Sequence, residues 1–451
     1  MGQKPIKILA IESSCDETAA SVVGFANENS KKQDAISKQI LNSKFEILNS
    51  CRPIILSNII SSQIDLHAKT GGVVPEVASR AHMEAIIPVI NEALITANSN
   101  VESRNSKQIQ NSNNINSKKV SDFVLNNSDL LQDVTHLAVT AGPGLIGSLL
   151  VGFNTAKSLA YSLDIPIIPI NHIEGHIYSA FGGEGTNSKK QDIFEVTLRA
   201  NKSQNSNIQS PNSYQLTPDS FPILALTVSG GHTSLTLMSD HGIYENIGQT
   251  LDDAAGEAFD KVAKLLELGY PGGPAVSRLA EQFRNRIKKQ ELRSEKILNS
   301  KFIIHNSTLV FPRPILNDGT FNFSFSGLKT AVLTKVKSLT ANSYQLTPAD
   351  KSAICCAFED AVVDVLVTKT LRAAEKHQPK AVILAGGVAA NRRLREELSY
   401  QLTATSYQLI LPPAELCGDN AAMIGVAAYY HILKNDIKTW DQIKVDSNLK
   451  L

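Results

Sequence analysis

Two histidines spaced one helical turn apart are the strongest candidates for chemistry in this sequence. His172 and His176 lie in the segment NHIEGH at 171–176, and residues four apart share one face of a helix. Two imidazoles on one face can bind a single metal ion, but two histidines on a helix surface would show the same spacing. A third ligand must come from elsewhere in the chain. Asp419 offers a carboxylate at the start of a predicted helix, where it could be an N-cap, a metal ligand or both.

A zinc peptidase is the first alternative that a pair of histidines at this spacing suggests. Such an enzyme needs a glutamate directly after the first histidine as its general base. That position is Ile173 here, and Glu174 projects to another side of the predicted helix. The sequence therefore disfavours a peptidase, although a hydrolase whose base comes from elsewhere stays open.

Three glycine-rich turns could bring backbone N–H groups close to phosphate oxygens, because glycine lacks the Cβ atom that keeps a ligand away. They are VSGGHT at 228–233 between two predicted strands, AGGVAAN at 385–391 between a strand and a helix, and GPG at 142–144. The helix after the second turn attracts anions at its N-terminus. Asn391 in that turn can donate to and accept from a ribose or a base. Each turn alone could equally be a tight hairpin or strand-helix turn.

An α/β fold must position these residues, since short β-rich runs alternate with helical patterns along the chain. In the first half the sequence predicts strands at 6–12, 19–25, 136–140 and 165–170 and helices at 145–163 and 172–181. In the second half it predicts strands at 223–229, 233–238, 381–385 and 408–411 and helices at 252–266, 351–376, 389–402 and 420–433. Each half begins with paired strands, and the order of the glycine turns is similar to that of the actin, hexokinase and sugar-kinase ATPase fold. We expect two α/β lobes with a ligand between them.

Polar stretches rich in Asn, Ser, Lys and Gln interrupt this pattern at about 28–56, 98–130, 183–220, 288–309 and 338–349. Some share words, such as NSYQLTP at 212–218 and 342–348, but they show neither the fixed period nor the apolar pattern of a structural repeat. We interpret them as insertions in surface loops, because lengthening a loop costs stability only slowly. Added arms that bind RNA or a partner are the functional alternative.

The length of 451 residues with 42% apolar composition allows two or three domain-sized units. The predicted organisation has a first lobe at 1–182, an inserted polar linker at 183–220, a second lobe at 221–434 and a C-terminal tail at 435–451. The predicted insertions at 28–56 and 98–130 belong to the first lobe. Those at 288–309 and 338–349 belong to the second.

Charge and cysteine content limit the kinds of partner and the cellular compartment that we expect for the protein. The chain has 44 Lys and Arg against 43 Asp and Glu, so no overall field draws it to nucleic acid or an anionic membrane, and any such contact needs a local patch or a partner. Five cysteines lack the spacing of a zinc knot or a disulfide framework, which fits a reducing compartment. The uncharged run at 137–156 contains too many glycines for a membrane span. With no signal-peptide pattern at the N-terminus, we expect a cytoplasmic protein without a membrane partner.

The same motifs make the chain similar to one family. Over nearly every segment outside the insertions it resembles the universal TsaD family of tRNA N6-adenosine threonylcarbamoyltransferases, once misnamed O-sialoglycoprotein endopeptidases or glycoproteases. Nine blocks carry the resemblance in order: IESSCDETAASVV from Ile11, HAKTGGVVPEVASRAH from His67, AVTAGPGLIGSLLVG from Ala138, NHIEGH from Asn171, TVSGGHTSL from Thr227, TLDDAAGEAFDKVAKLLELGYPGGP from Thr250, FNFSFSGLKTAV from Phe321, AGGVAANRRLR from Ala385 and CGDNAAMIG from Cys417. Chance does not produce nine such blocks in order.

The resemblance implies a two-lobed, actin- and hexokinase-like (ASKHA) ATPase fold. It also implies transfer of threonylcarbamoyl from threonylcarbamoyl-AMP to N6 of adenosine 37, forming t6A in tRNAs that read codons beginning with adenine. Attack by the N6 amine builds negative charge on an oxygen and expels AMP, so a cation beside the donor would stabilise the transition state. No covalent nucleophile is required, and Cys15 fits packing or loop structure better.

The resemblance also implies the residues of the site. One divalent metal ion, iron (Fe²⁺) in the first place and zinc as the alternative, would be held by His172, His176 and Asp419. The donor would lie along a turn and beside a further set of residues. The turn is Thr227, Val228, Ser229, Gly230 and Gly231, and the further set is Asp260, Gly273 and Asn391, with Ser277 as a weaker member.

Two residues are candidates for positioning N6 or its proton. They are Glu12 and His82, and His82 could instead cap or pair within its own helix. Asp252, Asp253 and Glu257 share the predicted helix of Asp260, and we expect one or two of these carboxylates only to cap or pair at the surface.

Partners follow from the resemblance as well. It implies tRNA, a TsaB-like paralogue and a TsaE-like P-loop ATPase as partners, with a TsaC-type synthase supplying the donor. The insertion at 183–220 departs from the family pattern between the metal helix and the phosphate strand, so partner docking or tRNA access could differ.

Three other functions stay open from the residues alone. They are an ATP-dependent small-molecule kinase of the same fold, a metallopeptidase and a non-catalytic scaffold. The metal-binding histidines disfavour the kinase, and the joint presence of metal and nucleotide residues disfavours the scaffold.

Overall fold

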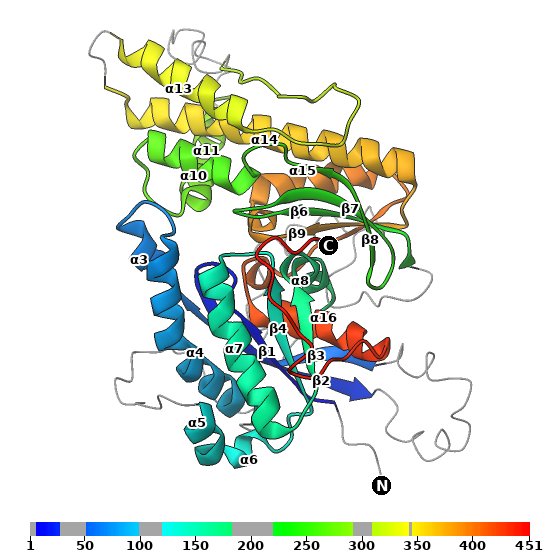
Figure 1. Cartoon of the computed structure of the whole chain (residues 1–451). Coiled ribbons are helices and arrows are strands. Elements are labelled where there is room, and N and C mark those ends of the chain that lie inside the picture. The colour runs from blue at the N-terminus through cyan, green and yellow to red at the C-terminus, as the bar shows by residue number, and fades with distance from the viewer. Residues whose placement is uncertain (1–5, 28–50, 99–119, 183–219, 292–308, 342–344) are drawn as a thin grey trace.

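Two five-stranded sheets with the same strand pattern form the framework of the chain (Figure 1). The computed structural model describes residues 6–27, 51–98, 120–182, 220–291, 309–341 and 345–451. The first sheet has the order β3-β2-β1-β4-β5 and the second β10-β9-β6-β7-β8. In each sheet the first three strands in sequence pair antiparallel, and the other two add in parallel beside the first. This repeated topology is the predicted two-lobed actin- and hexokinase-like fold.

The first sheet lies between two layers of helices. Its strands are β1 (Ile8–Glu12), β2 (Glu17–Asn27), β3 (Cys51–Ser62), β4 (His136–Gly142) and β5 (Ile167–Asn171). Successive side chains of a strand point to opposite faces. Leu9 and Ile11 accordingly pack in the core with α4 (Pro75–Asn98) and α7 (Ile146–Leu163). Ile8 and Ala10 pack on the other face in the core with α16 (Ala421–Leu433). Burial on both faces explains why β1 reads as a continuous apolar run.

The second sheet repeats this arrangement. Its strands are β6 (Ile223–Val228), β7 (Thr233–Asp240), β8 (Ile243–Gln249), β9 (Ala381–Ala385) and β10 (Gln408–Ile410). Ile223 and Ala225 of β6 join the core that also contains α8 (His172–Tyr178) and α16. Leu224 and Leu226 pack in a separate core on the opposite face. The helices of that face are α10 (Ala255–Leu265), α11 (Gly272–Glu291), α13 (Ser326–Thr340), α14 (Pro348–His377) and α15 (Arg392–Thr403).

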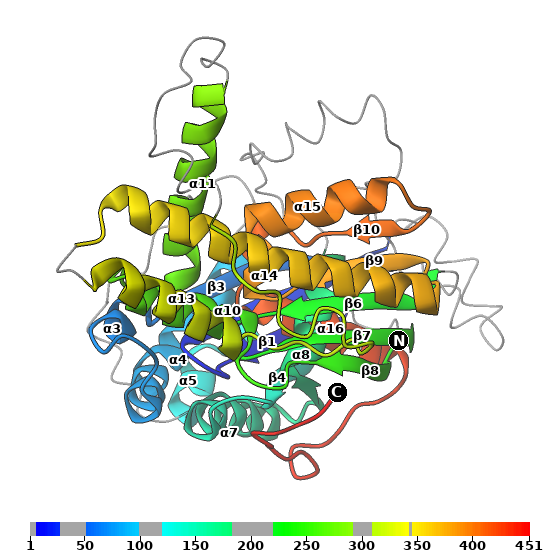
Figure 2. The same ribbon diagram turned by 90° about the horizontal axis from the view of Figure 1, so that it is seen from above.

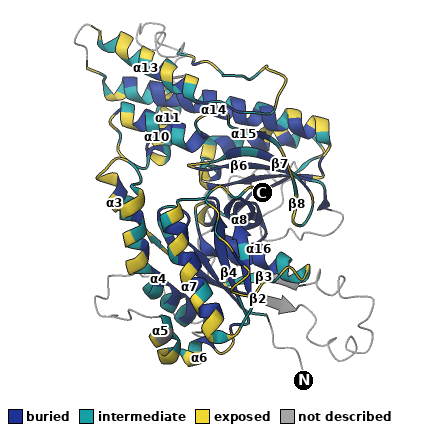
Figure 3. Ribbon diagram, in the orientation of Figure 1, coloured by how far each residue is buried: buried dark blue, intermediate teal, exposed yellow. Residues whose placement is uncertain are grey.

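The helices α8 and α16 therefore lie between the two sheets, as Figures 1 and 2 show. The inner strands β1, β4, β6 and β9 are dark blue in the burial view of Figure 3, because the helices cover both faces of each sheet there. Although α16 follows the second sheet in sequence, it packs against β1, β2 and α8 of the first half. The tail also returns to the first sheet, where Asp446 N donates to Ala141 O at 2.8 Å. The predicted domain boundaries stay a prediction.

The predicted strands and the predicted helices are all present, but several elements were not predicted. They are the strands β3 and β8 and the helices α3 (Ile64–Ala68), α4, α11 and α13. The predicted insertion at 28–56 was wrong at its end, because β3 begins at Cys51 and pairs antiparallel with β2. Both missed strands are edge strands. Unlike the edge strand β5, they have few buried residues, so their sequence pattern is less distinct.

The edges of three other predicted insertions also need correction. Residues 98–130 include α5 (Val120–Asn126) and α6 (Ser128–Leu131), which bury Phe123 and Leu131, and 288–291 belong to α11. In 338–349 the first residues end α13, and Thr347 is the N-cap of α14 with a capping box to Asp350. The first NSYQLTP copy and, apart from Ser220, the linker at 183–220 lie outside the described residues.

Two predicted helices begin later than expected. The helix predicted at 252–266 starts at Ala255, because Asp252 instead accepts hydrogen bonds from the backbone N–H groups of Phe325 and Ser326. The helix predicted from 389 starts at Arg392 after a 3₁₀ turn at Gly387–Ala390, and Asn391 is its N-cap. No helix within the described residues is both long enough and apolar enough to span a membrane.

Candidate functional site

Three side chains converge at the ends of the two helices between the sheets. His172 and His176 lie on α8, which directly follows β5, and the Asn171 side chain caps this helix by accepting from Ile173 N at 2.8 Å. Asp419 precedes α16. Its Oδ1 lies 3.5 Å from His172 Nε2 and 3.2 Å from His176 Nε2, and the three ligand atoms lie within 4.8 Å of one another. The structure thus brings the three predicted ligands together.

The donor set of this cluster fits a metal ion. His176 is fully buried, and its Nδ1 atom has no hydrogen-bond partner among the described residues, while its Nε2 atom lies 3.2 Å from Asp419 Oδ1 without the geometry of a hydrogen bond. A buried polar atom without a partner is costly, and a metal ion on Nε2 would satisfy one of these atoms. Two imidazoles and a carboxylate suit divalent iron or zinc. The N-cap of α16 is Asn420, whose side chain accepts from Met423 N, so the alternative that Asp419 caps this helix was wrong.

A buried carboxylate orients the first of these histidines. Glu12 Oε2 lies 3.1 Å from His172 Nδ1 and accepts from Thr140 Oγ1 at 2.6 Å, while Oε1 accepts from Ser14 N at 2.5 Å. A proton held on Nδ1 by this contact leaves Nε2 free for a metal. Burial alone would raise the pKa of Glu12, but the charge and hydrogen bond of His172 lower it. Burial would lower the pKa of His172, but the charges of Asp419 and Glu12 outweigh this and raise it to about 9. A metal that binds Nε2 therefore displaces a proton from that atom.

The other candidate for proton transfer, His82, holds the loop between β1 and β2. It lies buried on α4, with Nε2 3.0 Å from Cys15 O and Nδ1 2.7 Å from Thr18 Oγ1. Burial lowers the pKa of His82, so the neutral ring donates from Nε2 to the carbonyl and accepts from Thr18. Both partners lie outside α4, so the alternative of a partner within the same helix was wrong.

Two of the predicted glycine turns lie side by side in the second half. A Cβ on Gly386, where φ is +91°, would lie 2.4 Å from Val228 O, and one on Gly256 would lie 2.5 Å from Ser229 O. Only glycine permits the turn at 385–391 and the helix α10 to approach the end of β6 this closely. A Cβ on Gly230 or Gly231 would meet nothing within 4 Å. The backbone of this turn therefore borders open space in which a ligand can lie.

Thr227 and Val228 are buried at the end of β6, before this turn. The hydroxyl oxygen of Thr227 has no hydrogen-bond partner among the described residues. In the turn itself, Ser229 Oγ accepts from His232 N at 3.1 Å.

Asp260 and Gly273 meet at the start of α11. Asp260 Oδ1 accepts from Gly272 N at 2.7 Å, and a Cβ on Gly273 would also border open space. Burial raises the pKa of Asp260, and the charge of Asp16 in the first half adds to this. Tyr270 Oη lies 3.5 Å from Asp16 Oδ2. The loop after β1 thus faces α10 and α11 across the two halves.

The carboxylates near Asp260 on the same segment pair with a lysine or cap a helix. Asp253 and Glu257 both pair with Lys261, at 2.6 and 2.9 Å. Asp252 Oδ1 accepts from Phe325 N and Ser326 N at the start of α13. The prediction that one or two of these carboxylates cap or pair is therefore confirmed.

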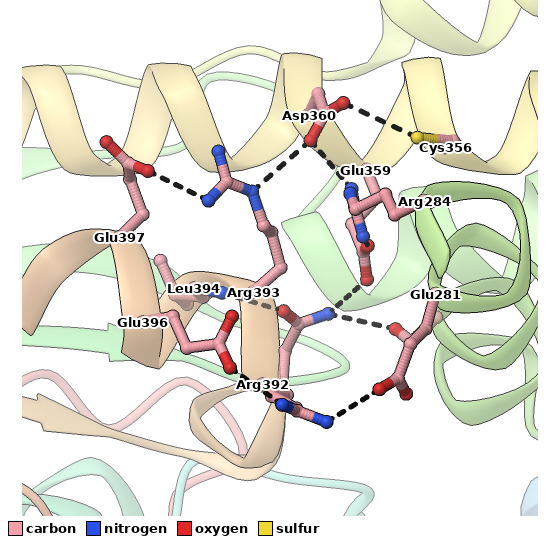
Figure 4. Close-up of polar contacts among 12 residues, drawn as sticks. Glu281, Arg284, Cys356, Glu359, Asp360, Arg392, Arg393, Leu394, Glu396 and Glu397 are labelled. Atoms are coloured by element: carbon pink, nitrogen blue, oxygen red, sulfur yellow. Dashed lines mark hydrogen bonds and ion pairs between the residues drawn. The ribbon is translucent and has the colours of Figure 1, made fainter. Parts of the chain in front are cut away.

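Asn391 and Ser277 form the last part of the predicted donor site. Asn391 Nδ2 donates to Ser277 Oγ at 2.9 Å and to Glu359 Oε1 at 2.7 Å, and Oδ1 accepts from Leu394 N at 2.9 Å. These contacts join α11, α14 and α15, and Figure 4 shows the surrounding ion pairs.

The cluster of His172, His176 and Asp419 faces the first of the two turns. The ring centroids of His172 and His232 lie 6.5 Å apart, and His232 belongs to the turn after β6. Burial and the charges of His172 and His176 lower the pKa of His232 to about 4. A neutral imidazole and exposed backbone of the turn therefore lie beside the three candidate ligands.

Sequence reasoning did not single out three residues of this region. Ser14 Oγ lies 3.1 Å from His172 Nδ1, and Ser14 and His232 both stand within motifs that carried the resemblance, so those motifs could have indicated them. Glu359 stands in the middle of α14, where nothing in the local sequence marks it.

Comparison with known proteins gives a consistent picture. A sequence profile described as "TsaD: tRNA N6-adenosine threonylcarbamoyltransferase" matches residues 54–105, 111–190 and 203–426. Proteins of that description from Geotalea uraniireducens (strain Rf4) and Bacillus subtilis (strain 168) are 40% and 38% identical to this chain. The first match covers 96% of this chain and 94% of the relative, and the second covers 94% and 90%.

Among solved structures, a HypF from T. kodakarensis matches 71% of this chain and 44% of its own at 12% identity and a TM-score of 0.44. A ROK family glucokinase from Streptomyces griseus matches 94% and 98% at 11% identity and a TM-score of 0.34.

Proposed function

The chain belongs to the TsaD family of tRNA N6-adenosine threonylcarbamoyltransferases, and from this premise we propose how its site performs the transfer. The enzyme attaches threonylcarbamoyl to N6 of adenosine 37 in tRNA and so forms t6A. In the proposed reaction the N6 nitrogen bonds to the carbamoyl carbon of threonylcarbamoyl-AMP. The bond between that carbon and the phosphate oxygen breaks, AMP leaves, and the amine loses a proton.

One observation carries the assignment of the site. The three converging ligands lie beside the turn that follows β6, with the His172 and His232 rings 6.5 Å apart. A donor whose phosphate rests on this turn would place its carbamoyl group toward the three ligands. The phosphate and the carbamoyl group of the donor can then both be bound at this one site.

We assign the resident metal to His172, His176 and Asp419, with iron as the first expectation and zinc as the alternative. When bound, such an ion polarises the carbonyl oxygen that gains negative charge in the transition state. The chain's own task is to hold three ligand atoms in place, and the contact between Glu12 and His172 Nδ1 contributes to that task.

The second half binds the nucleotide part in this proposal. The backbone of Gly230 and Gly231 meets phosphate oxygens, since added Cβ atoms there would occupy open space. Asp260, Gly273, Ser277 and Asn391 lie toward the ribose and adenine. Glu12 and His82 use their polar atoms for His172, Ser14, Thr140, Cys15 and Thr18. We therefore assign both residues to positioning, and direct proton transfer by either stays a prediction.

The alternatives are less well supported. A peptidase would need a free general base near the histidines, but Glu174 accepts from Tyr244 Oη at 2.6 Å and contacts His431 at 3.1 Å. Phosphoryl transfer by a small-molecule kinase does not require the cluster of His172, His176 and Asp419.

Partners and compartment follow the family expectation. We propose that the enzyme binds tRNA and works in the cytoplasm with a TsaB-like paralogue and a TsaE-like P-loop ATPase. A TsaC-type synthase would supply the donor.

Reconstitution tests the transferase and its site together. The purified protein is incubated with tRNA, threonine, bicarbonate, ATP and the adenylate-forming synthase, with and without the two bacterial partners, and the nucleosides are analysed by mass spectrometry. We expect t6A with the wild type and none with His172→Ala or Asp419→Ala. His377→Ala, which alters a histidine at the end of α14, should remain active. Equal t6A formation by the two ligand variants would refute the assigned metal site.

A further inference from the structure

A buried carboxylate on α14 fixes the amide of Asn391. Glu359 is 1% exposed, and its Oε1 accepts from Asn391 Nδ2 at 2.7 Å. Its Oε2 accepts from Arg284 Nη1 on α11 at 2.6 Å (Figure 4). A charged acceptor this deeply buried is normally paired. Its two oxygens face one donor from α11 and one from the turn before α15, so it connects both elements.

The hydrogen bonds of Asn391 are then almost fully used. An asparagine amide has two N–H donors and an oxygen with two lone pairs. Both donors are engaged, by Glu359 and by Ser277, and Oδ1 already accepts from Leu394 N as the cap of α15. One lone pair on Oδ1 is left. Toward a ligand, this side chain can only accept.

Glu359 also determines which way the amide points. Rotating the Asn391 amide by half a turn would place Oδ1 against the Glu359 carboxylate and Nδ2 against Leu394 N–H. Two acceptors would then face each other on one side and two donors on the other, which is strongly unfavourable when buried. The carboxylate therefore holds Oδ1 on the side of the cap.

We propose that Glu359 is a positioning residue for the nucleotide. It orients Asn391 so that Oδ1 accepts a hydrogen bond from threonylcarbamoyl-AMP. The chemical groups that fit are a ribose hydroxyl or the amino group of adenine. The inference rests on the proposed donor site, and it assigns Glu359 to binding of the nucleotide and not to the transfer step.

Exchanging the carboxylate of Glu359 and the amide of Asn391, singly and together, tests this proposal. In Glu359→Gln the new amide cannot accept from both Arg284 and Asn391. In Asn391→Asp two carboxylates face each other across 2.7 Å in the wild-type geometry. In the double variant the pattern is satisfied again in reverse, because the new amide donates to the new carboxylate and accepts from Arg284. Asp360→Asn is the matched control, since Asp360 also accepts from Arg284, at 2.6 Å, and lies next to Glu359 on α14.

The measurements are the Kd for AMP by calorimetry, and kcat and KM for the donor in the reconstituted reaction. We expect Glu359→Gln to weaken AMP binding and raise KM by about tenfold, the effect of one hydrogen bond, with kcat within about twofold. Asn391→Asp should weaken binding at least as much. The double variant should recover to within about threefold of the wild type, because a complete set of partners is restored. Asp360→Asn should bind as the wild type does.

Several outcomes overturn the inference. Wild-type affinity in Glu359→Gln would do so, as would a double variant no better than Asn391→Asp or an equal loss in Asp360→Asn. A loss of kcat without a change in Kd would assign the network to the reaction step instead. Thermal unfolding of each variant shows that the fold is retained. A wild type that forms t6A but does not bind AMP would refute the proposed donor site itself.

Discussion

Replacing Glu12 by glutamine should weaken metal binding without altering any ligand. Glu12 is completely buried, and both of its oxygens accept hydrogen bonds. A glutamine of the same shape places an NH₂ group at one of the two positions. If it faces Ser14 N, a buried donor loses its acceptor. If it faces His172 Nδ1, the ring can satisfy it only by moving its proton to Nε2, the atom needed for the metal.

The size of the effect follows from the role of the contact. Loss of a partner that orients a metal-binding histidine typically lowers metal affinity by about 10- to 100-fold, which corresponds to roughly 1.4 to 2.7 kcal/mol. The lower end applies if Thr140 rotates its hydroxyl to accept from the new amide. The upper end applies if the ring changes its tautomer.

The assay is titration of the metal-free protein with Zn²⁺ or Fe²⁺ in competition with a coloured chelator. Thr140→Val is the control, because it removes one hydrogen bond to Glu12 but keeps the carboxylate and its 3.1 Å contact with His172. Its affinity should change much less. If Glu12→Gln bound metal as tightly as the wild type, the orientation of His172 by Glu12 would be refuted.

Three further predictions concern stability. Gly386→Ala should lower the free energy of unfolding by about 2 kcal/mol or more, because φ is +91° and the new Cβ would lie 2.4 Å from Val228 O; Gly387→Ala, which meets nothing, should change little in denaturant titrations, and equal effects would contradict the argument. Burial lowers the pKa of His241 to about 4, so the unfolded chain binds its proton first and stability falls as the pH drops from about 6.5 toward 4. His241→Gln should lose less stability between pH 7 and 4.5 than the wild type in denaturant titrations, and an equal loss would count against this cause. Removing the metal with a chelator should lower Tm, because a bound ion stabilises the folded state; the difference should vanish in His176→Ala, and a persisting difference would place the metal elsewhere.

Much of the fold could be predicted from local patterns. The strands β1, β4, β6 and β9 are buried on both faces and read as short apolar runs, and α7 and α14 are long and end where expected. The edge strands β3 and β8 were missed because few of their residues are buried, whereas the buried edge strand β5 was predicted. The helix α11 was missed because much of its surface is exposed and charged, so no apolar run marks it.

The sequence by itself determined the chemistry that is local. It placed two imidazoles four residues apart directly after a strand, and glycines where the backbone approaches Val228 and Ser229, since helix period and the absence of a Cβ are properties of neighbouring residues. It also offered Asp419 as a candidate third ligand or an N-cap, and the family blocks favoured the ligand role.

Only the tertiary structure decided which distant groups meet. Glu12 contacts His172 because β1 and β5 flank β4 in one sheet. Asp419 reaches α8 because α16 leaves the second half and packs on the first sheet. Glu359 meets Asn391 because α14 passes the turn before α15. Such contacts depend on how sheets and helices pack, and no local period in the sequence specifies that packing.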